Sequence, residues 1–146
     1  MSSSLFGVFS VSSSGMEAQR IRTQLLAENI ANAETTRTPE GGPYRRKDAV
    51  FTTVNPEQPF SSVLDAQMDS MSGVAVREVV VDQSAPQRRY LPGHPDADKD
   101  GYVSFPQLNP AQEMVDLMGA SSSYQANVAA VSTAKDMIQR SLDLFR

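Results

Sequence analysis

The amino-acid sequence predicts an α+β protein, with a long α-helix at each end of the chain and a small β-rich, loop-heavy middle region. Apolar residues recur with the helical period near both ends, and short β-branched runs occupy the centre. Seven of the nine prolines lie between Pro39 and Pro95, and proline is rare inside helices and central strands. The expected regions are an N-terminal helix in residues 1–36, a β-rich region in 37–107 and a C-terminal helix in 108–146.

The N-terminal segment begins with seven serines in residues 1–14, which favours a flexible opening. Beyond it, apolar residues follow the helical period as far as Ala33 and form a wide stripe, so the helix needs neighbours on more than one side. We expect the helix to end near Thr36, because Pro39 and the pair Gly41-Gly42 disfavour the helical conformation.

Three runs of β-branched and aromatic residues in the middle region predict strands, at residues 50–54, 74–81 and 102–105. The run at 74–81 is nearly all apolar, a pattern typical of a strand that is covered on both faces. Segments rich in proline, glycine, aspartate and serine separate these runs and predict loops, and the pair Gly41-Gly42 predicts a turn.

The C-terminal helix has the clearest start signal in the sequence. Asn109 is a good N-cap, Pro110 suits the first helical position, Gln112 stands where a capping box takes Glu or Gln, and Glu113 favours the positive end of the helix. Ten positions then alternate in steps of three and four, as in a heptad seam. They are Met114, Leu117, Ser121, Tyr124, Val128, Val131, Lys135, Ile138, Leu142 and Phe145. We expect this helix to continue to the chain end, over about 36 residues or roughly 54 Å.

The composition excludes several classes of protein. Thirteen Lys and Arg against 17 Asp and Glu give a net charge of −4, which argues against nucleic acid as a main partner. The absence of cysteine removes disulfide scaffolds, thiolate zinc sites and cysteine nucleophiles. No stretch approaches the roughly 18 apolar residues of a spanning helix, and residues 1–19 lack the Lys or Arg of a Sec-type signal. We therefore expect a chain without a cleavable signal that is not membrane-inserted.

One local motif matches part of the calcium-loop pattern of EF-hands. Asp96, Asp98 and Asp100 occupy loop positions 1, 3 and 5, and Gly101 occupies position 6. Position 12 is Gln107 instead of the glutamate that closes such a site, and nearby prolines leave no flanking helices. A solvated acidic turn is the preferred interpretation. The alternative is a calcium-dependent coiled-coil binding module that uses the loop from Asp96 to Gln107.

No catalytic grouping is expected. His94 is the only histidine, and without a second histidine or a cysteine no transition-metal site or Ser-His-Asp grouping assembles. Asp65 and Asp69 lie one helical turn apart if residues 63–71 are helical, but a solvated helix face explains them without chemistry. We expect no enzyme activity, no catalytic residue, no cofactor, no bound metal and no small-molecule substrate.

Two spots combine basic and aromatic residues, at 44–47 (Tyr44-Arg45-Arg46-Lys47) and at 88–90 (Arg88-Arg89-Tyr90). Such spots hold phosphates and stack bases in nucleic-acid binders. On an acidic chain we interpret them instead as exposed strand or interface charges that pair with acids of a neighbour.

Motifs near opposite ends of the chain resemble a known pair of signatures. Near the N-terminus they are Ser14-Gly15-Met16-Glu17-Ala18-Gln19 and Leu26-Ala27-Glu28-Asn29-Ile30-Ala31-Asn32-Ala33-Glu34-Thr35. Near the C-terminus they are Asn109-Pro110, Glu113-Met114-Val115, Ser123-Tyr124-Gln125-Ala126-Asn127 and Thr133-Ala134-Lys135-Asp136-Met137. In this order they resemble the terminal signatures of bacterial flagellar axial proteins, the family of rod, hook and hook-associated proteins. The short length and the segments at 36–47, 94–98 and 101–103 are most similar to its proximal rod members.

The resemblance implies a structural subunit of the flagellar basal body. It implies helical stacking into a hollow rod, in which the terminal helices form a coiled-coil tube domain, and a drive shaft that transmits torque and passes exported subunits outward. The implied partners are other flagellar rod proteins, copies of the chain itself and the adaptor between the rod and the membrane ring. The implied location is the periplasm, reached by flagellar type III export.

Both long helices need partners on physical grounds as well, because a small middle region cannot cover them. We expect an assembly interface made of apolar residues from the two helices. These residues are Ile21, Leu25, Leu26, Ile30, Met114, Leu117, Tyr124, Val128, Val131, Ile138 and Leu142.

Overall fold

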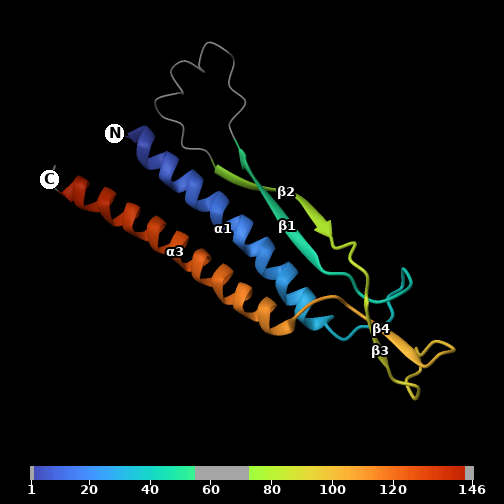
Figure 1. Cartoon of the computed structure of the whole chain (residues 1–146). Helices are drawn as coiled ribbons and strands as arrows, with labels where there is room; N and C mark the ends of the chain where they lie inside the picture. The colour runs from blue at the N-terminus through green and yellow to red at the C-terminus, as the bar shows by residue number, and fades with distance from the viewer. Residues whose placement is uncertain (1, 55–72, 144–146) are drawn as a thin grey trace, which may run out of the picture. The chain divides into compact units, whose positions relative to one another are not determined.

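The computed structural model describes residues 2–54 and 73–143, and it confirms the α+β class (Figure 1). The elements in chain order are α1 (Ser2–Ala31), β1 (Lys47–Val54), β2 (Gly73–Val81), β3 (Gln87–Tyr90), β4 (Tyr102–Phe105) and α3 (Pro110–Asp143). Strands β1 and β2 form one two-stranded sheet, and β3 and β4 form another. Three of the strands were predicted. Strand β3 was not among the predicted runs, because its sequence is polar and all four residues are exposed; it matches the interpretation of Arg88-Arg89-Tyr90 as exposed strand charges.

The chain divides into two compact units, each of which contains part of both helices. Unit 1 comprises Met1–Ile21, Phe51–Arg77 and Ala120–Arg146, and unit 2 comprises Arg22–Val50 and Glu78–Gly119. Helices α1 and α3 and strands β1 and β2 therefore each contribute residues to both units.

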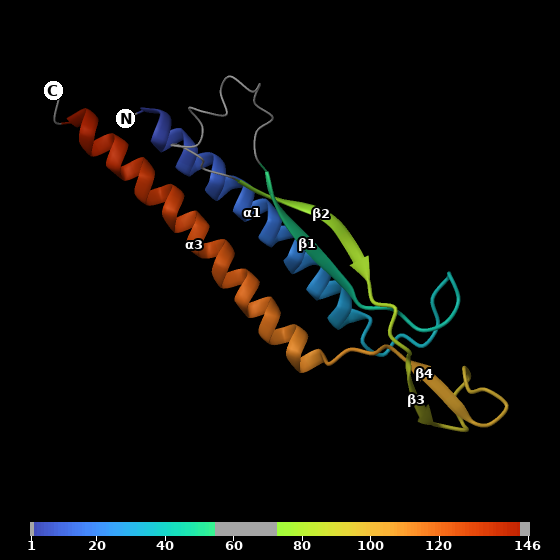
Figure 2. The same cartoon turned by 45° about the horizontal axis from the view of Figure 1, so that its top comes forward.

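In unit 1 the N-terminal part of α1 lies beside the C-terminal part of α3 (Figures 1 and 2). A Cβ atom placed on Gly15 would lie 3.1 Å from the side-chain nitrogen of Asn127, so glycine allows a close approach of the two helices. The neighbouring residue, Ser14, contacts the sheet. Its Oγ accepts a hydrogen bond from the backbone N–H of Val74 at 3.0 Å. The pair Ser14-Gly15 thus holds α1 against both β2 and α3.

Helix α1 differs from its prediction at both ends. It begins at Ser2, where a flexible serine-rich opening was expected. Tertiary packing outweighs the modest helix propensity of serine here, because Ser12 is buried in unit 1. The helix ends at Ala31 instead of near Thr36, because the side chain of Asn32 donates to the carbonyl oxygen of Glu28 at 2.9 Å and a turn follows.

The predicted strand at residues 74–81 is present as β2, but the expectation that it is covered on both faces is wrong. Val79, Val80 and Val81 are 45%, 45% and 37% exposed. The sheet has only two strands, so the second half of β2 has little protein to pack against in the single chain.

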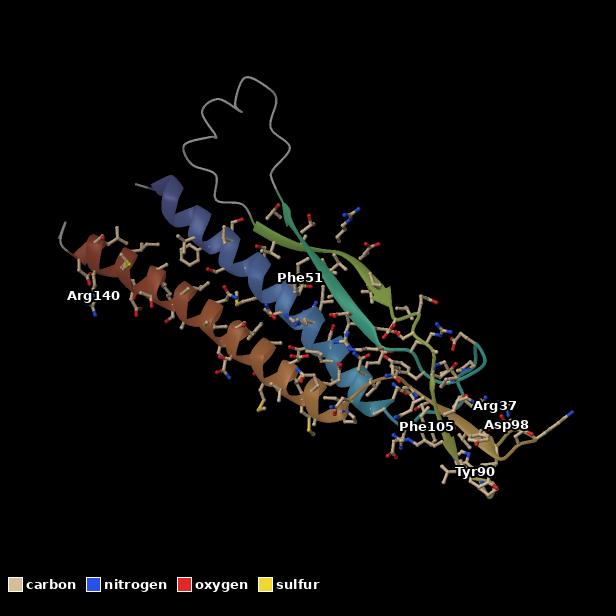
Figure 3. All side chains as sticks on the ribbon, viewed as in Figure 1. Arg37, Phe51, Tyr90, Asp98, Phe105 and Arg140 are labelled. Carbon is tan, nitrogen blue, oxygen red and sulfur yellow. The ribbon has the colours of Figure 1, made fainter. Side chains whose placement is uncertain are left out.

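In unit 2, β3 and β4 pair antiparallel, with Tyr90 opposite Tyr102. Val103 and Phe105 of β4 are buried, whereas Tyr90 is 63% exposed; Figure 3 labels Tyr90 and Phe105. Gly101 ends the hairpin loop with a φ of 81°, a conformation that favours glycine. The predicted turn at Gly41-Gly42 is also confirmed, since both residues have positive φ values.

Helix α3 begins as predicted at Pro110. The Oδ1 atom of Asn109 accepts a hydrogen bond from the backbone N–H of Ala111 at 3.0 Å, which is N-cap geometry. The side-chain amide nitrogen of Gln112, the residue expected to complete a capping box, donates to Oδ1 of Asp116 at 3.4 Å. The apolar core is thin, as the composition indicates: Ala18, Ala120 and Ala134 are among its buried residues.

Two points of the sequence analysis concern residues outside the described part of the chain: the acids Asp65 and Asp69 in the possible helical turn at 63–71, and the seam residue Phe145. In the part that is described, neither α1 nor α3 contains a segment long and apolar enough to span a bilayer.

Candidate functional site

A buried polar network in unit 2 joins the last turns of α1 to the first turn of α3. Its centre is the side chain of Asn29, which is 0% exposed. The amide nitrogen of Asn29 donates to the carbonyl oxygen of Lys47 and to Oε2 of Glu113, both at 2.9 Å. Its amide oxygen accepts from the hydroxyl of Tyr44 at 2.9 Å and from the backbone N–H of Lys47 at 3.0 Å. The amide thus makes all four of its hydrogen bonds.

The second member of the network is Glu113, in the first turn of α3, which is 2% exposed. One carboxylate oxygen accepts from Asn29, and the other accepts from Nε of Arg46 at 2.6 Å. This charged hydrogen bond raises the pKa of the Arg46 guanidinium above its ordinary value. Arg46 also pairs with Asp48 at 3.1 Å. A buried carboxylate is costly unless it is paired and hydrogen-bonded, and Glu113 is both.

Tyr44 closes the network from the segment that precedes β1. It is 7% exposed, and its backbone N–H donates to the carbonyl oxygen of Thr35 at 3.0 Å. Burial, together with the nearby charges of Glu28 and Glu113, raises the pKa of Tyr44 to about 12. Tyr44 therefore stays protonated and donates to Asn29 across the physiological range. Beside it, the Lys47 ammonium pairs with Glu28.

The role of this network is structural. Its charged groups are saturated by one another, and it holds α1, the start of β1 and α3 together at one point of unit 2. The sequence alone does not reveal this network, although most of its residues belong to motifs described above. One signal was available: Asn29 is a polar residue inside the apolar stripe of α1, three residues after the buried Leu26. Nothing local in the sequence pairs Asn29 with a glutamate 84 residues away.

The structure places the expected interface residues in two groups. Leu26 is buried in the chain, and six others are half-buried: Ile21, Leu25, Ile30, Leu117, Val131 and Ile138. The remaining four are exposed, at 55% for Met114, 39% for Tyr124, 44% for Val128 and 64% for Leu142. The most buried positions of α3 are instead Glu113, Ala120 and Ala134. The buried face of α3 therefore does not coincide with the predicted seam. Its buried residues each come one position before a seam residue, namely before Met114, Ser121 and Lys135.

The uncovered part of α3 carries further large apolar side chains. Val115, Met118 and Met137 are 56%, 65% and 58% exposed, in addition to the four exposed interface residues. We call these seven residues the exposed apolar side of α3. A large exposed apolar surface on a protein commonly marks an interaction site.

Comparisons with known proteins agree along nearly the whole chain. Residues 9–37 match the family model described as flagella basal body rod protein, and residues 99–144 match the one described as flagellar basal body rod FlgEFG protein C-terminal. Flagellar basal-body rod proteins named FlgC are 39% identical in Borreliella burgdorferi and 37% identical in Bacillus subtilis and in Salmonella typhimurium. These matches cover 95–97% of this chain and 97–98% of the relatives. The chain belongs to the FlgC family of flagellar basal-body rod proteins.

The buried network of this FlgC-family chain contains residues from both regions that match the family models. Asn29 lies in the N-terminal match and Glu113 in the C-terminal match. The two terminal motifs of the family are thus in direct contact in unit 2.

The acidic loop of this FlgC-family chain is an internally bonded turn. Oδ1 of Asp98 accepts from the backbone N–H groups of Tyr102 at 2.8 Å and Asp100 at 3.0 Å, which together with Arg88 lowers the pKa of Asp98. Its Oδ2 pairs with Arg88 at 2.5 Å. Asp96 accepts from the hydroxyl of Thr36 at 2.7 Å and lies 3.9 Å from Arg37; Figure 3 labels Arg37 and Asp98. No cluster of three metal-binding side chains occurs among the described residues, and the calcium alternative has no support.

Within the FlgC-family chain both basic spots have charged partners, and Arg88, Arg89 and Tyr90 lie on the exposed strand β3; the pairing with acids of a neighbour stays a prediction. Arg46 pairs with Glu113, Lys47 with Glu28, and Arg88 with Asp98. The guanidinium of Arg89 lies 4.8 Å from the ring centre of Phe105. The sequence could not show this, because the acids come from distant segments of the same fold.

Proposed function

We propose that this chain is a structural subunit of the proximal rod of the bacterial flagellar basal body. In this proposal it assembles helically with other rod proteins and with copies of itself into a hollow shaft, which transmits torque and passes exported subunits. The adaptor between rod and membrane ring is a further partner. The near full-length similarity to FlgC proteins supports the rod assignment, because it includes both terminal regions and the middle of the chain.

The observation that carries the proposal is the exposed apolar side of α3. A helix of 34 residues that leaves Met114, Met118, Val128 and Leu142 at 44–65% exposure is unfavourable in a free monomer. Neighbouring helices in a coiled-coil tube supply the missing cover. The same packing accounts for the expected interface, in which the half-buried residues of both helices and the exposed residues of α3 become covered together.

The proposed role requires no catalytic residue, cofactor or small-molecule substrate. The most prominent polar grouping, around Asn29 and Glu113, is saturated by its own members. We further propose that the subunit acts in the periplasm and reaches it through the flagellar type III apparatus without a cleavable signal. Family membership supports this location.

The substitution Val128→Asp tests the proposal. Val128 is 44% exposed in the single chain, so an aspartate there remains hydrated and changes the stability of the purified protein little. In the assembled tube the same carboxylate is buried without a partner in every copy, which costs several kcal/mol per site. Cells that carry Val128→Asp should therefore make and export the protein but form no complete rod and lose motility.

Val128→Thr is the matched control, because threonine has nearly the shape of valine and carries no charge. These cells should swim. Intact rods and normal motility in Val128→Asp cells would contradict the assignment of this side of α3 to assembly. The thermal unfolding of both purified variants distinguishes an assembly defect from a folding defect.

A further inference from the structure

The three methionines of α3 lie on the surface of the single chain. Met114 and Met118 in unit 2 are 55% and 65% exposed, and Met137 in unit 1 is 58% exposed. Among the residues that the structure describes, Met16 is the one other methionine, and it is half-buried. The three exposed methionines all belong to the exposed apolar side of α3. The surface that we assign to assembly therefore carries accessible thioether groups.

Oxidation of these methionines should leave the fold of the single chain intact. The buried positions of α3 are Glu113, Ala120 and Ala134, so the packing of the helix within the chain depends on other side chains. A polar group at an exposed position stays hydrated and changes stability little. The oxidised and unoxidised subunits should therefore differ in their surface and not in their fold.

A methionine thioether reacts with peroxide without a catalyst. The sulfur attacks one oxygen of hydrogen peroxide, so that a sulfur–oxygen bond forms and the oxygen–oxygen bond breaks. The proton of the transferred oxygen passes to the departing hydroxide, which leaves as water. The sulfur is oxidised by two electrons, and the peroxide is reduced. The product, methionine sulfoxide, is polar, and exposed methionines form it first.

The same change is costly wherever the side chain becomes covered. An apolar contact between helices offers no donor to a sulfoxide oxygen, and a buried acceptor without a partner is strongly disfavoured. We propose that Met114, Met118 and Met137 are modification sites at which peroxide converts the subunit into a form that cannot assemble. This inference rests on the proposed function, because it takes the exposed apolar side of α3 as an assembly surface.

Oxidation of the purified full-length chain tests the chemistry. The chain is treated with dilute hydrogen peroxide and digested, and mass spectrometry gives the sulfoxide at each methionine over time. The three methionines of α3 should oxidise about threefold or more faster than Met16, because peroxide reaches them more readily. Helical circular dichroism should stay unchanged. Equal rates at all four positions, or a loss of helix on oxidation, would overturn the proposal.

Rod assembly in cells tests the consequence. Cells that lack one other rod protein accumulate this chain and receive a pulse of peroxide that oxidises most of its copies. The peroxide is removed before the missing protein is supplied, and rods are counted by electron microscopy. The pulse should lower the number of rods about fivefold or more when the chain is unchanged.

Two variants show whether the loss of rods originates in α3. The triple variant Met114→Leu, Met118→Leu and Met137→Leu keeps an apolar surface that peroxide does not oxidise, so its rods should be equally numerous with and without the pulse. Met16→Leu is the matched control and should be as sensitive as the unchanged chain. An equal loss of rods in the unchanged chain and the triple variant would overturn the proposal.

A second measurement needs no substitution. After the pulse, sulfoxide at the three positions should be depleted in assembled rods relative to the unassembled chain of the same cells, and equal fractions would overturn the proposal. Val128→Asp separates this inference from the proposed function. If Val128→Asp cells form no rods while oxidised chains enter rods normally, only this inference fails. If Val128→Asp cells form intact rods, the proposed assembly surface fails and this inference fails with it.

Discussion

Removal of the Arg46 side chain isolates the energetic role of the buried network. In Arg46→Met the carboxylate of Glu113, 2% exposed, loses its cation and keeps only the hydrogen bond from Asn29. Loss of one partner from a fully buried ion pair costs about 3–5 kcal/mol. The side chain of Arg46 is 27% exposed, so water replaces part of the lost interaction. We therefore expect a loss of about 2–3 kcal/mol in the free energy of unfolding.

Urea denaturation of the purified chain, followed by circular dichroism, measures this loss. Arg45→Met is the matched control, because Arg45 is the adjacent arginine and donates only to Gln83 and to the carbonyl oxygen of Asp82 on the surface. It should change the free energy of unfolding by less than about 0.5 kcal/mol.

A double substitution tests the cause of the loss. In Arg46→Met with Glu113→Gln no unpaired charge remains, so the double variant should be more stable than Arg46→Met alone, by about 1 kcal/mol or more. The reasoning is refuted if Arg46→Met costs no more than Arg45→Met, or if the second substitution adds a further loss of stability.

Two more predictions concern Tyr44 and the acidic loop. The pKa of Tyr44 is raised to about 12, so its contribution to stability is complete below about pH 10 and is lost between about pH 10 and 12. Tyr44→Phe should remove that part of the alkaline loss in denaturation curves, and identical pH profiles for the two proteins would contradict the assignment. Calorimetric titration with calcium should show no micromolar binding, because Asp98 is used by Tyr102, Asp100 and Arg88; saturable heat abolished by Asp96→Ala would restore the calcium alternative.

The elements of the fold were predictable where the pattern is local. The N-cap at Asn109, the strands at 74–81 and 102–105 and the turn at Gly41-Gly42 are all present. Each depends on the properties of a few adjacent residues. Errors occurred where tertiary contacts outweigh local preference. The serine-rich start is helical because it packs in unit 1, and the valines of β2 are exposed because the sheet has only two strands.

The buried network could not be predicted from local sequence patterns, for a different reason. Tyr44, Arg46 and Glu113 were noted as parts of separate motifs, but their chemistry depends on a fold that brings residues 29, 44–47 and 113 together. A basic spot next to an aromatic residue has the same sequence pattern whether its charges face solvent, a partner or the same chain. Only the geometry separates these alternatives.

The central claim is that this chain forms part of the rod wall with the exposed apolar side of α3 covered by other subunits. Electron cryomicroscopy of basal bodies purified from cells that produce this chain tests it most directly. The account predicts density for α1 and α3 in the wall of the proximal rod, with Met114, Met118, Val128 and Leu142 packed against helices of neighbouring subunits. A rod that lacks the chain, or one in which these four residues face solvent, would contradict the account.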